Sequence, residues 1–191
     1  MRITYNAPFV LSFTILCTVV LLLDGLFVNA GVMKQFFVLY PSFSLADPLS
    51  YLRLFSHAIG HAHWGHLLGN FTFILLIGPI IEEKYGTKKL AFAAFSTAII
   101  TGLLHLFLFA NGLLGASGIV FMLIVLSSIT NFKKGELPLT FVLVCVLFIG
   151  KEIIGSFGED HVSQFAHIIG GVCGGFFGWV WNSSSSDQSK D

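Results

Sequence analysis

The sequence has few charged residues, and they balance. Only 10% of its 191 residues are charged, the ten basic residues match the ten acidic ones, and the net charge is zero. Neutrality removes any electrostatic argument for binding nucleic acid or acidic substrates. Hydrophobic residues instead make up 55% of the chain, and the mean hydropathy is +0.85, far above what soluble globular domains show. The composition is that of a membrane protein.

Cysteine is also scarce. The three cysteines, Cys17, Cys145 and Cys173, are odd in number and lack zinc-ligand spacing, so the chain has neither a disulfide framework nor a cysteine metal site. All three fall in long apolar runs, which is typical of small buried side chains. No HExxH motif is present either.

Long apolar runs separate the few charged clusters. A bilayer core of about 30 Å needs a helix of about 20 apolar residues. The runs predict six membrane spans, at residues 8–28, 62–82, 88–109, 115–132, 137–156 and 162–182. We therefore predict one all-α membrane domain over residues 1–182, with a short fourth helix, and a disordered Ser-rich tail over residues 183–191. A signal peptide is the alternative for the first run, although the run is long for one.

The basic residues divide unevenly between the two sides of the membrane. With the N-terminus inside, the inner ones are Arg2, Lys84, Lys88, Lys89, Lys133, Lys134 and Lys190, and the outer ones are Lys34, Arg53 and Lys151. Because inner loops are enriched in Lys and Arg, both termini are predicted to be cytoplasmic. We expect a bacterial inner membrane. The connection over residues 29–61 is then external and is expected to lie in the membrane interface.

Polar residues gather where the second span begins: His57, His61, His63, His66 and Asn70. Several polar groups together in lipid usually mark a site, because each is unfavourable unless paired. His66 and Asn70 are four residues apart on one helical face, so both can donate to one point, as an oxyanion hole requires. His57 and His61 have the same spacing and would make half of a metal site. Histidines that cap a helix and anchor a loop are the more ordinary explanation for that pair.

Ser117 lies in the Gly-Ala-Ser-Gly motif of residues 115–118, ahead of a short apolar run. A helix from Ser117 to Phe132 extends about 22 Å, less than the hydrocarbon thickness of about 30 Å. Ser117 is therefore expected to start its helix inside the bilayer, beside backbone N–H groups that favour an anion. Small residues that permit tight helix packing are the alternative explanation.

The last span carries a histidine and a stripe of glycines. His167 precedes Gly170, Gly174 and Gly178, which repeat every four residues and allow a neighbouring helix to approach closely. If that neighbour is the fourth span, the imidazole can reach the Ser117 hydroxyl.

Helix arithmetic places four polar side chains at one depth. Counted from the inner ends of their spans, Ser117, His167, His66 and Asn70 all lie about 18–24 Å along their helices. A serine, an adjacent base and two neutral donors make a complete acyl-transfer site. Because no acidic residue stands where it would orient His167, we predict a Ser–His dyad.

The chain resembles the rhomboid family of intramembrane serine proteases over nearly its whole length, from Arg53 to Gly178. The order and spacing of four elements agree. They are the series His57, His61, His66 and Asn70, the segment from Glu82 to Gly86, the motif from Gly115 to Gly118, and the motif from Ala166 to Gly174 that contains His167 and Gly170.

The resemblance implies a metal-free, ATP-independent peptidase, without a cofactor, that cuts transmembrane proteins near the membrane boundary. Ser117 would be the nucleophile and His167 the base. His66 and Asn70 would form the oxyanion hole together with the Ser117 backbone.

Two positions depart from the family pattern. Many members have Trp before the arginine of the first external loop, where this chain has Leu52 before Arg53. Many also have Tyr four residues after the nucleophile, stacked on the catalytic histidine, where this chain has Phe121. Ring stacking does not need the hydroxyl, so we expect an active enzyme.

Two other functions remain open at the level of sequence. A catalytically inactive rhomboid-like protein would bind transmembrane clients without cleaving them, although Ser117 and His167 argue against it. A small metal or solute transporter would use the histidine cluster, and its metal binding would depend on His57 and His61.

Overall fold

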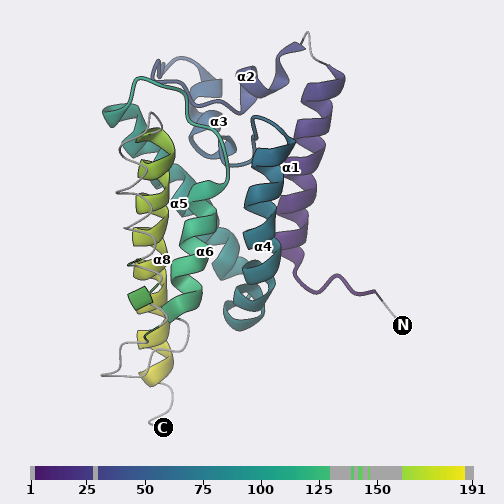
Figure 1. The fold of residues 1–191 in the computed structure, drawn as a ribbon. Coiled ribbons are helices and arrows are strands. Elements are labelled where there is room, and N and C mark those ends of the chain that lie inside the picture. Colours follow the sequence, from purple (N-terminus) through teal and green to yellow (C-terminus); the bar gives the residue numbers. More distant parts are fainter. Residues whose placement is uncertain are drawn as a thin grey trace.

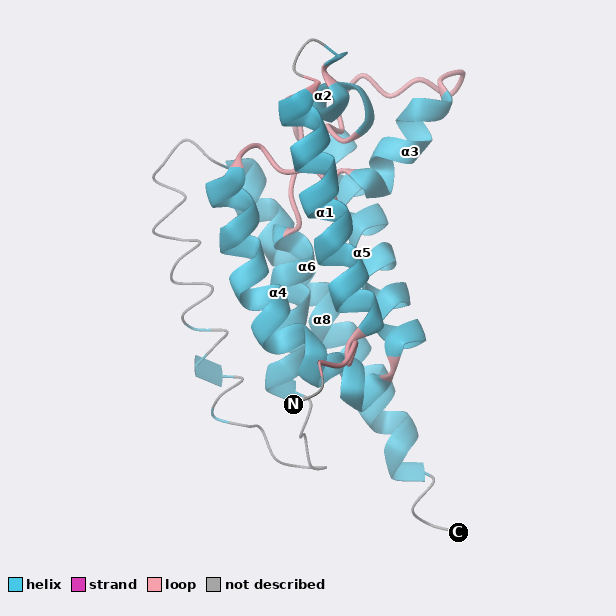
Figure 2. Cartoon of the chain, turned by 90° about the vertical axis from the view of Figure 1, so that its right-hand side faces the viewer, coloured by secondary structure: helices cyan, strands magenta, loops and turns pink. Residues whose placement is uncertain are grey.

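A computed structural model describes residues 3–27, 30–129, 139, 142, 143, 146 and 161–187. Its helices are α1 (Pro8–Leu26), α2 (Val32–Phe36), α3 (Pro48–Ser56), α4 (Trp64–Tyr85), α5 (Thr87–Leu108), α6 (Ser117–Ile129) and α8 (His161–Asp187). Figures 1 and 2 show the five longer helices side by side, with α2 and α3 at one end. We call this the loop end, and the opposite end, where α1 begins and α8 finishes, the terminal end. The predicted all-helical bundle is confirmed over the described residues.

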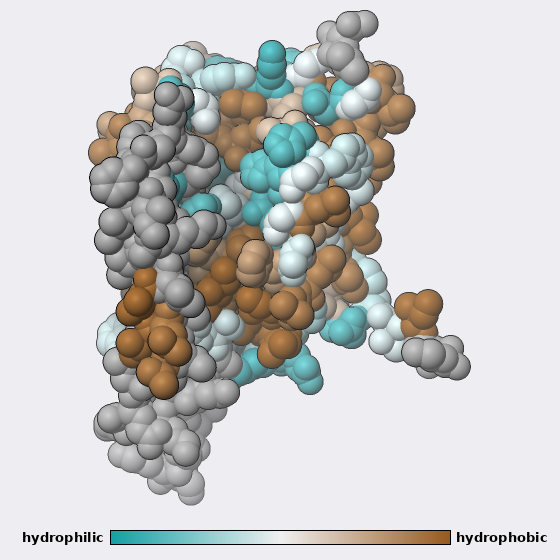
Figure 3. All heavy atoms as spheres, in the orientation of Figure 1, coloured by the Kyte–Doolittle hydropathy of each residue, from teal (hydrophilic) through white to brown (hydrophobic). Residues whose placement is uncertain are grey.

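Three helices in the described part of the chain are long and apolar enough to cross a membrane. They are α1, with 19 residues, and α4 and α5, with 22 residues each. Helix α6 is apolar but shorter, with 13 residues. Apolar side chains cover much of the middle of the bundle on the face drawn in Figure 3. The predicted fifth span, residues 137–156, lies almost wholly outside the described residues.

The ends of α4 differ from the predicted bounds of 62–82 for local reasons. The helix begins at Trp64 because the His63 side chain caps it by accepting the His66 N–H. It ends at Tyr85 because Gly86 has a φ of 86°, a conformation that glycine adopts without steric penalty. Helix α5 starts at the next residue.

Glu82 joins three helices at the terminal end. Its carboxylate accepts the N–H groups of Phe9 and Val10 at 2.8 and 3.0 Å and the Thr87 hydroxyl at 2.7 Å. The side chain is only 4% exposed. A carboxylate at a helix N-terminus satisfies otherwise unpaired donors and the helix dipole, so Glu82 caps α1 from α4 and also binds the first turn of α5.

The glycine stripe of α8 packs against α6. A Cβ atom on Gly170 would overlap the carbonyl oxygen of Gly118, and one on Gly174 would overlap the carbonyl oxygen of Met122. The two backbones are therefore in direct contact at these levels. The close neighbour that the glycine stripe allows is therefore α6, in the predicted fourth span.

Helix α8 continues past residue 182, where the last span was expected to end, and reaches Asp187. An existing helix lengthens at little cost in free energy, since each added residue brings one more hydrogen bond. Asn182 fastens this part of α8, because its amide donates to the Ile129 carbonyl at 2.6 Å and accepts the Tyr85 hydroxyl at 3.2 Å. Residues 188–191 of the predicted tail lie outside the described residues.

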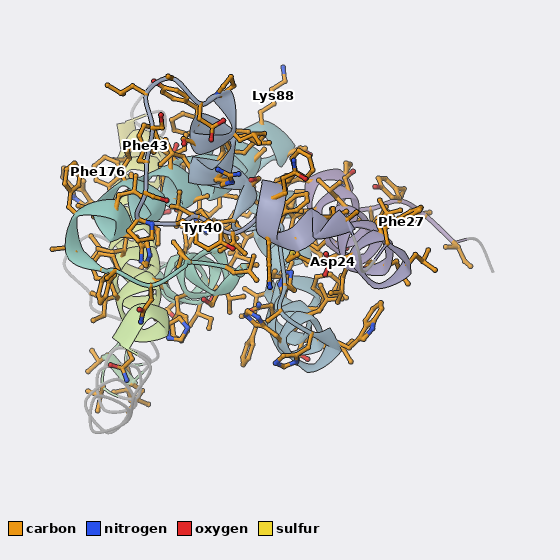
Figure 4. All side chains as sticks on the ribbon, turned by 90° about the horizontal axis from the view of Figure 1, so that it is seen from above. Asp24, Phe27, Tyr40, Phe43, Lys88 and Phe176 are labelled. Atoms are coloured by element: carbon orange, nitrogen blue, oxygen red, sulfur yellow. The ribbon has the colours of Figure 1, made fainter. Side chains whose placement is uncertain are left out.

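Residues 30–61 fold over the loop end. Leu39 and Leu113 exchange two backbone hydrogen bonds of 3.0 and 2.9 Å. Asp24, near the end of α1, accepts the Met33 N–H of α2 at 2.7 Å; Figure 4 views the molecule from above and labels Asp24. The segment thereby ties α1 to the loop that leads into α6.

Candidate active site

Ser117 is the first residue of α6 and is half-buried. Two hydrogen bonds hold the loop before it: the Gly115 N–H donates to the His57 carbonyl at 2.9 Å, and the His105 ring donates to the Asn111 carbonyl at 2.7 Å. The first N–H groups of a helix lack intrahelical acceptors, so the position of Ser117 suits a group that becomes negatively charged.

Gly115 makes room for the His66 ring. Its φ of 124° is strained for any residue with a side chain. A Cβ atom there would lie 2.6 Å from His66 Cε1 and 2.7 Å from His66 Nε2. The ring is therefore in contact with the backbone just two residues before Ser117. His66 Nδ1 accepts the Ala62 N–H at 3.5 Å, a long hydrogen bond, and this leaves Nε2 as the donor that faces Gly115.

Asn70 lies one turn further along α4 and is held by His61. The Nδ1–H of His61 donates to the Ile59 carbonyl at 3.0 Å, so its Nε2 accepts from the Asn70 amide at 3.1 Å. The His61 and His66 rings are in edge contact, with centroids 5.1 Å apart. The structure thus groups both predicted oxyanion donors around one buried imidazole.

His167 lies beside the first turns of α6. Its ring is 4.1 Å from the Phe121 ring, centroid to centroid, at an interplanar angle of 32°. The preceding Ala166 carbonyl lies 3.3 Å from where a Cβ on Gly118 would stand. The ring contact expected from Phe121 is present, and the backbone contact between α6 and α8 brings His167 to the level of Ser117.

A small cavity lies beside Ser117, lined in part by His57, Thr97, Thr101, Gly115, Gly118 and Ala166. Four buried polar atoms at or near it have no hydrogen-bond partner among the described groups: His57 Nδ1, Thr97 Oγ1, Thr101 Oγ1 and His105 Nδ1. Buried polar atoms are normally satisfied, and internal water needs such partners. The cavity therefore offers water a polar setting close to the serine.

His57 and His61 anchor the backbone. His57 Nε2–H donates to the Ala98 carbonyl at 3.0 Å, as His61 does to Ile59. Burial lowers the pKa of each histidine to about 4, so both rings are neutral at pH 7. Across the described residues, no group of three or more His, Cys, Asp or Glu side chains is arranged to hold a metal ion. Both rings bond backbone carbonyl groups, as the loop-anchoring explanation predicts.

Other predicted residues lie away from Ser117. Arg53 sits on α3, where its Nε–H donates to the Gln35 carbonyl at 2.8 Å and its Nη1 meets Asp47 at 3.4 Å. It ties α3 to α2 without help from an aromatic ring at Leu52. Glu82 is at the terminal end, and Gly174 lies one turn below Gly170 against Met122.

Sequence reasoning missed three residues near the site. It assigned no role to His105 or Thr101 and gave none to the His63 ring. One signal was available: Thr97, Thr101 and His105 repeat every four residues along one face of α5. The cap formed by His63 had no such signal, because imidazole is not among the usual capping side chains.

Comparisons with known proteins identify the family of the chain. The family model of the rhomboid domain matches residues 48–184. The chain is 37% identical to rhomboid-related protein 1 of Caenorhabditis elegans over 142 residues, 67% of this chain and 39% of that protein. It is 24% identical to rhomboid protease GlpG of Haemophilus influenzae over 173 residues, 89% of this chain and 88% of that protein.

A third relative is rhomboid-like protease 2 of Toxoplasma gondii, 29% identical over 149 residues. The match covers 71% of this chain and 49% of that protein, so the chain spans less than half of two of these three relatives. With helices able to cross a membrane and a rhomboid domain over most of its length, the chain is an integral membrane protein of the rhomboid family.

Proposed function

We propose that the chain is an intramembrane serine endopeptidase in which Ser117 is the nucleophile and His167 the general base. The observation that carries the proposal is the backbone contact of Gly118 with Gly170. It brings a serine at a helix start and a histidine to the same level of the bundle. The dyad needs a hydrogen bond between Ser117 Oγ and the imidazole during catalysis.

In the first step, Ser117 Oγ attacks the carbonyl carbon of the scissile peptide, and His167 takes the hydroxyl proton. The carbonyl electron pair moves onto oxygen. His66, Asn70 and the Ser117 N–H would donate hydrogen bonds to this oxyanion. His66 is suited to the role because its Nε2 is the donor nitrogen and faces Gly115.

In the second step, the tetrahedral intermediate collapses and the C–N bond breaks. His167 returns the proton to the leaving amine, and the acyl group remains on Ser117. Water then attacks the ester with His167 again acting as base, which releases the carboxylic acid and restores the serine. The small cavity lined in part by His57 and Thr101 would supply that water. The reaction calls for no metal or cofactor.

The proposed setting is a six-span bundle with both termini in the cytoplasm of a bacterial inner membrane. Helix α6 has 13 residues and is about 20 Å long, shorter than the hydrocarbon core of about 30 Å. Ser117 would then lie within the membrane, nearer the outer side. Both the start of α1 and the finish of α8 lie at the terminal end (Figure 1), which agrees with termini on one side.

The substrates we propose are transmembrane proteins that approach laterally from the bilayer. A peptide bond inside a helix is hydrogen-bonded and shielded by neighbouring turns. Cleavage therefore requires local unwinding, and small or helix-breaking residues near the cut are expected to speed it. The cut would fall near the outer membrane boundary.

The test is cleavage of a transmembrane reporter in liposomes by the wild type, Ser117→Ala and His167→Ala. Both variants are expected to lose activity by at least about 10³-fold, since dyad members act as one unit. Ser127→Ala is the matched control, because that hydroxyl only bonds the Ile124 carbonyl of its own helix, at 2.8 Å. A fluorophosphonate probe should label the wild type and Ser127→Ala but not Ser117→Ala, and should label His167→Ala far more slowly because its serine lacks the activating base.

Equal cleavage by all forms would overturn the protease assignment. No cleavage by the folded wild type, together with retention of transmembrane clients, would favour the inactive, client-binding alternative.

A further inference from the structure

We infer that His63 is a positioning residue that holds the oxyanion donor His66 through an imidazole version of a helix capping box. The inference rests on the proposed function, because it assumes that His66 contacts the reacting carbonyl. It concerns a residue to which neither the sequence nor the family match assigns a role.

The arrangement begins with the cap of α4. His63 has extended backbone angles, φ −165° and ψ 168°, and its Nδ1 accepts the His66 N–H at 3.1 Å. This is the bond that a Ser or Asp cap makes to the third residue of a helix. His66 occupies that third position, so the cap acts directly on the residue that carries the donor ring.

The second half of the box runs in the opposite direction. In a capping box, the side chain of the third helical residue accepts the backbone N–H of the capping residue. Here His66 Nδ1 accepts the N–H of Ala62, the residue just before the cap, at 3.5 Å. The two rings are 6.1 Å apart, centroid to centroid. Together the two bonds restrict rotation of His66 and favour its Nε2–H tautomer, the form that can donate to an oxyanion.

Gly65 provides the space for this cap. A Cβ atom there would lie 3.3 Å from His63 Nδ1 and 3.4 Å from His63 Cε1, tighter than an ordinary van der Waals contact. A side chain at residue 65 would therefore press on the accepting nitrogen. This gives a second, independent way to disturb the box without changing a histidine.

The cap requires an acceptor nitrogen, so His63 Nδ1 carries no hydrogen in this arrangement. The rings grouped with His63 are His66 on α4 and, one ring further, His61 in the preceding loop. A serine at residue 63 would accept the same N–H through its hydroxyl oxygen, without a ring.

The experiment compares His63→Ala, His63→Ser and the wild type on the transmembrane reporter in liposomes. At pH 7.5 we expect kcat to fall about tenfold for His63→Ala, with KM within about twofold, and to stay within about twofold for His63→Ser. That loss is smaller than the 10²–10³-fold expected for deleting an oxyanion donor outright. Thr72→Val on α4 is the control, because its exposed hydroxyl only bonds the Leu68 carbonyl.

Rescue by the conservative variant separates positioning from general stability. A serine at residue 63 restores the cap without the ring, so a kcat that falls in His63→Ala and recovers in His63→Ser, at unchanged KM, reports on the cap itself.

A double variant completes the test. Gly65→Ala should lower kcat about threefold in the wild type and not in the His63→Ser background, where the ring is gone. Thermal unfolding of each protein shows that the comparison is made on folded material.

A wild-type kcat in folded His63→Ala would overturn the inference while leaving the protease assignment intact. Full cleavage by Ser117→Ala in the same assay would instead remove the proposed function on which it rests.

Discussion

The two ends of the bundle differ in how completely their buried polar groups are hydrogen-bonded. At the terminal end, the Glu82 carboxylate accepts three hydrogen bonds, and the Asn182 amide uses both its oxygen and its nitrogen. Towards the loop end, His57, Thr101 and His105 each bury a polar atom without a partner among the described groups. Satisfied networks fix a structure, whereas unsatisfied ones near a cavity are typical of sites where something binds or reacts.

The difference matches the proposed division between structural and chemical roles in this protein. Polar groups of the terminal end hold α1, α4, α5, α6 and α8 together and need no further partner. Polar groups of the loop end surround Ser117. The following predictions, from the largest expected effect to the smallest, test whether that division holds.

The largest effect is expected where the two roles meet, at Gly170. In Gly170→Val the new side chain overlaps the Gly118 carbonyl, so α8 must move away from α6 and carry His167 with it. We expect destabilisation of about 3 kcal/mol and loss of cleavage. Thermal unfolding and reporter cleavage are the measurements. Gly175→Ala is the control, because no atom lies within 4 Å of a Cβ at that position.

The second largest effect is expected from acid, which should lower the stability of the fold through the buried histidines of the loop end. The pKa values of His57 and His61 are about 4, below the ordinary histidine value of about 6.5. The unfolded chain therefore binds more protons, and stability is lost as the pH falls from about 6.5 to about 4. Unfolding midpoints measured across this range should fall steeply for the wild type and less for His61→Gln. Parallel curves would show that these rings do not govern acid stability.

Gly115→Ala should affect chemistry more than stability. The added methyl meets the His66 ring at 2.6 Å, and a φ of 124° is unfavourable for alanine. Displacement of the oxyanion donor should lower kcat about 10²-fold. Kinetics on the reporter are compared with Gly69→Ala on α4, where a Cβ has no neighbour within 4 Å. Similar kcat values for the two variants would argue against a role for His66.

Glu82→Gln should show the reverse pattern. An amide has one acceptor oxygen in place of two, so at least one of the three donors loses its partner, and we expect a loss of about 1–3 kcal/mol in unfolding free energy. Activity per folded molecule should change by less than about threefold. Glu83→Gln, on an exposed neighbour, should alter neither. A large fall in kcat at unchanged stability would contradict the division of roles.

Thr101→Val should change stability least. The hydroxyl has no partner among the described groups, so an isosteric apolar side chain is expected to change unfolding free energy by less than about 0.5 kcal/mol. If the hydroxyl binds the hydrolytic water, release of the acyl-enzyme should slow about threefold while acylation does not. Ser56→Ala, which deletes a hydroxyl bonded to the Phe36 carbonyl at 2.6 Å, should lose about 1 kcal/mol.

The sequence was sufficient for the helices and for the pairing of two of them. Apolar runs predicted α1, α4 and α5, and glycines at four-residue spacing predicted a close helix neighbour for α8, because helix period and side-chain size act locally. Helix ends were less well predicted. The start of α4 depends on an imidazole cap and its finish on the conformation of Gly86, and neither follows from hydropathy.

The residues of the candidate site were predictable from the sequence, but the hydrogen-bond partners that hold them were not. Ser117, His167, His66 and Asn70 were identifiable because polar groups in an apolar segment are rare and fell at one depth. Their partners were not, since His61 reaches Asn70 through a turn, and Glu82 reaches Phe9 across 73 residues. Hydrogen bonds of this kind depend on where separate helices meet.

By itself, then, the sequence determined that this is a helical membrane protein with a serine and a histidine on two helices able to approach closely. Helix periodicity, hydropathy and the lack of a side chain at glycine carry that information, and all three can be read before the fold is known. Only the tertiary structure decided which polar groups are satisfied and which remain unpaired, because satisfaction depends on distances of about 3 Å between residues far apart in the chain. The contrast between the two ends of the bundle is therefore a property of the folded molecule alone.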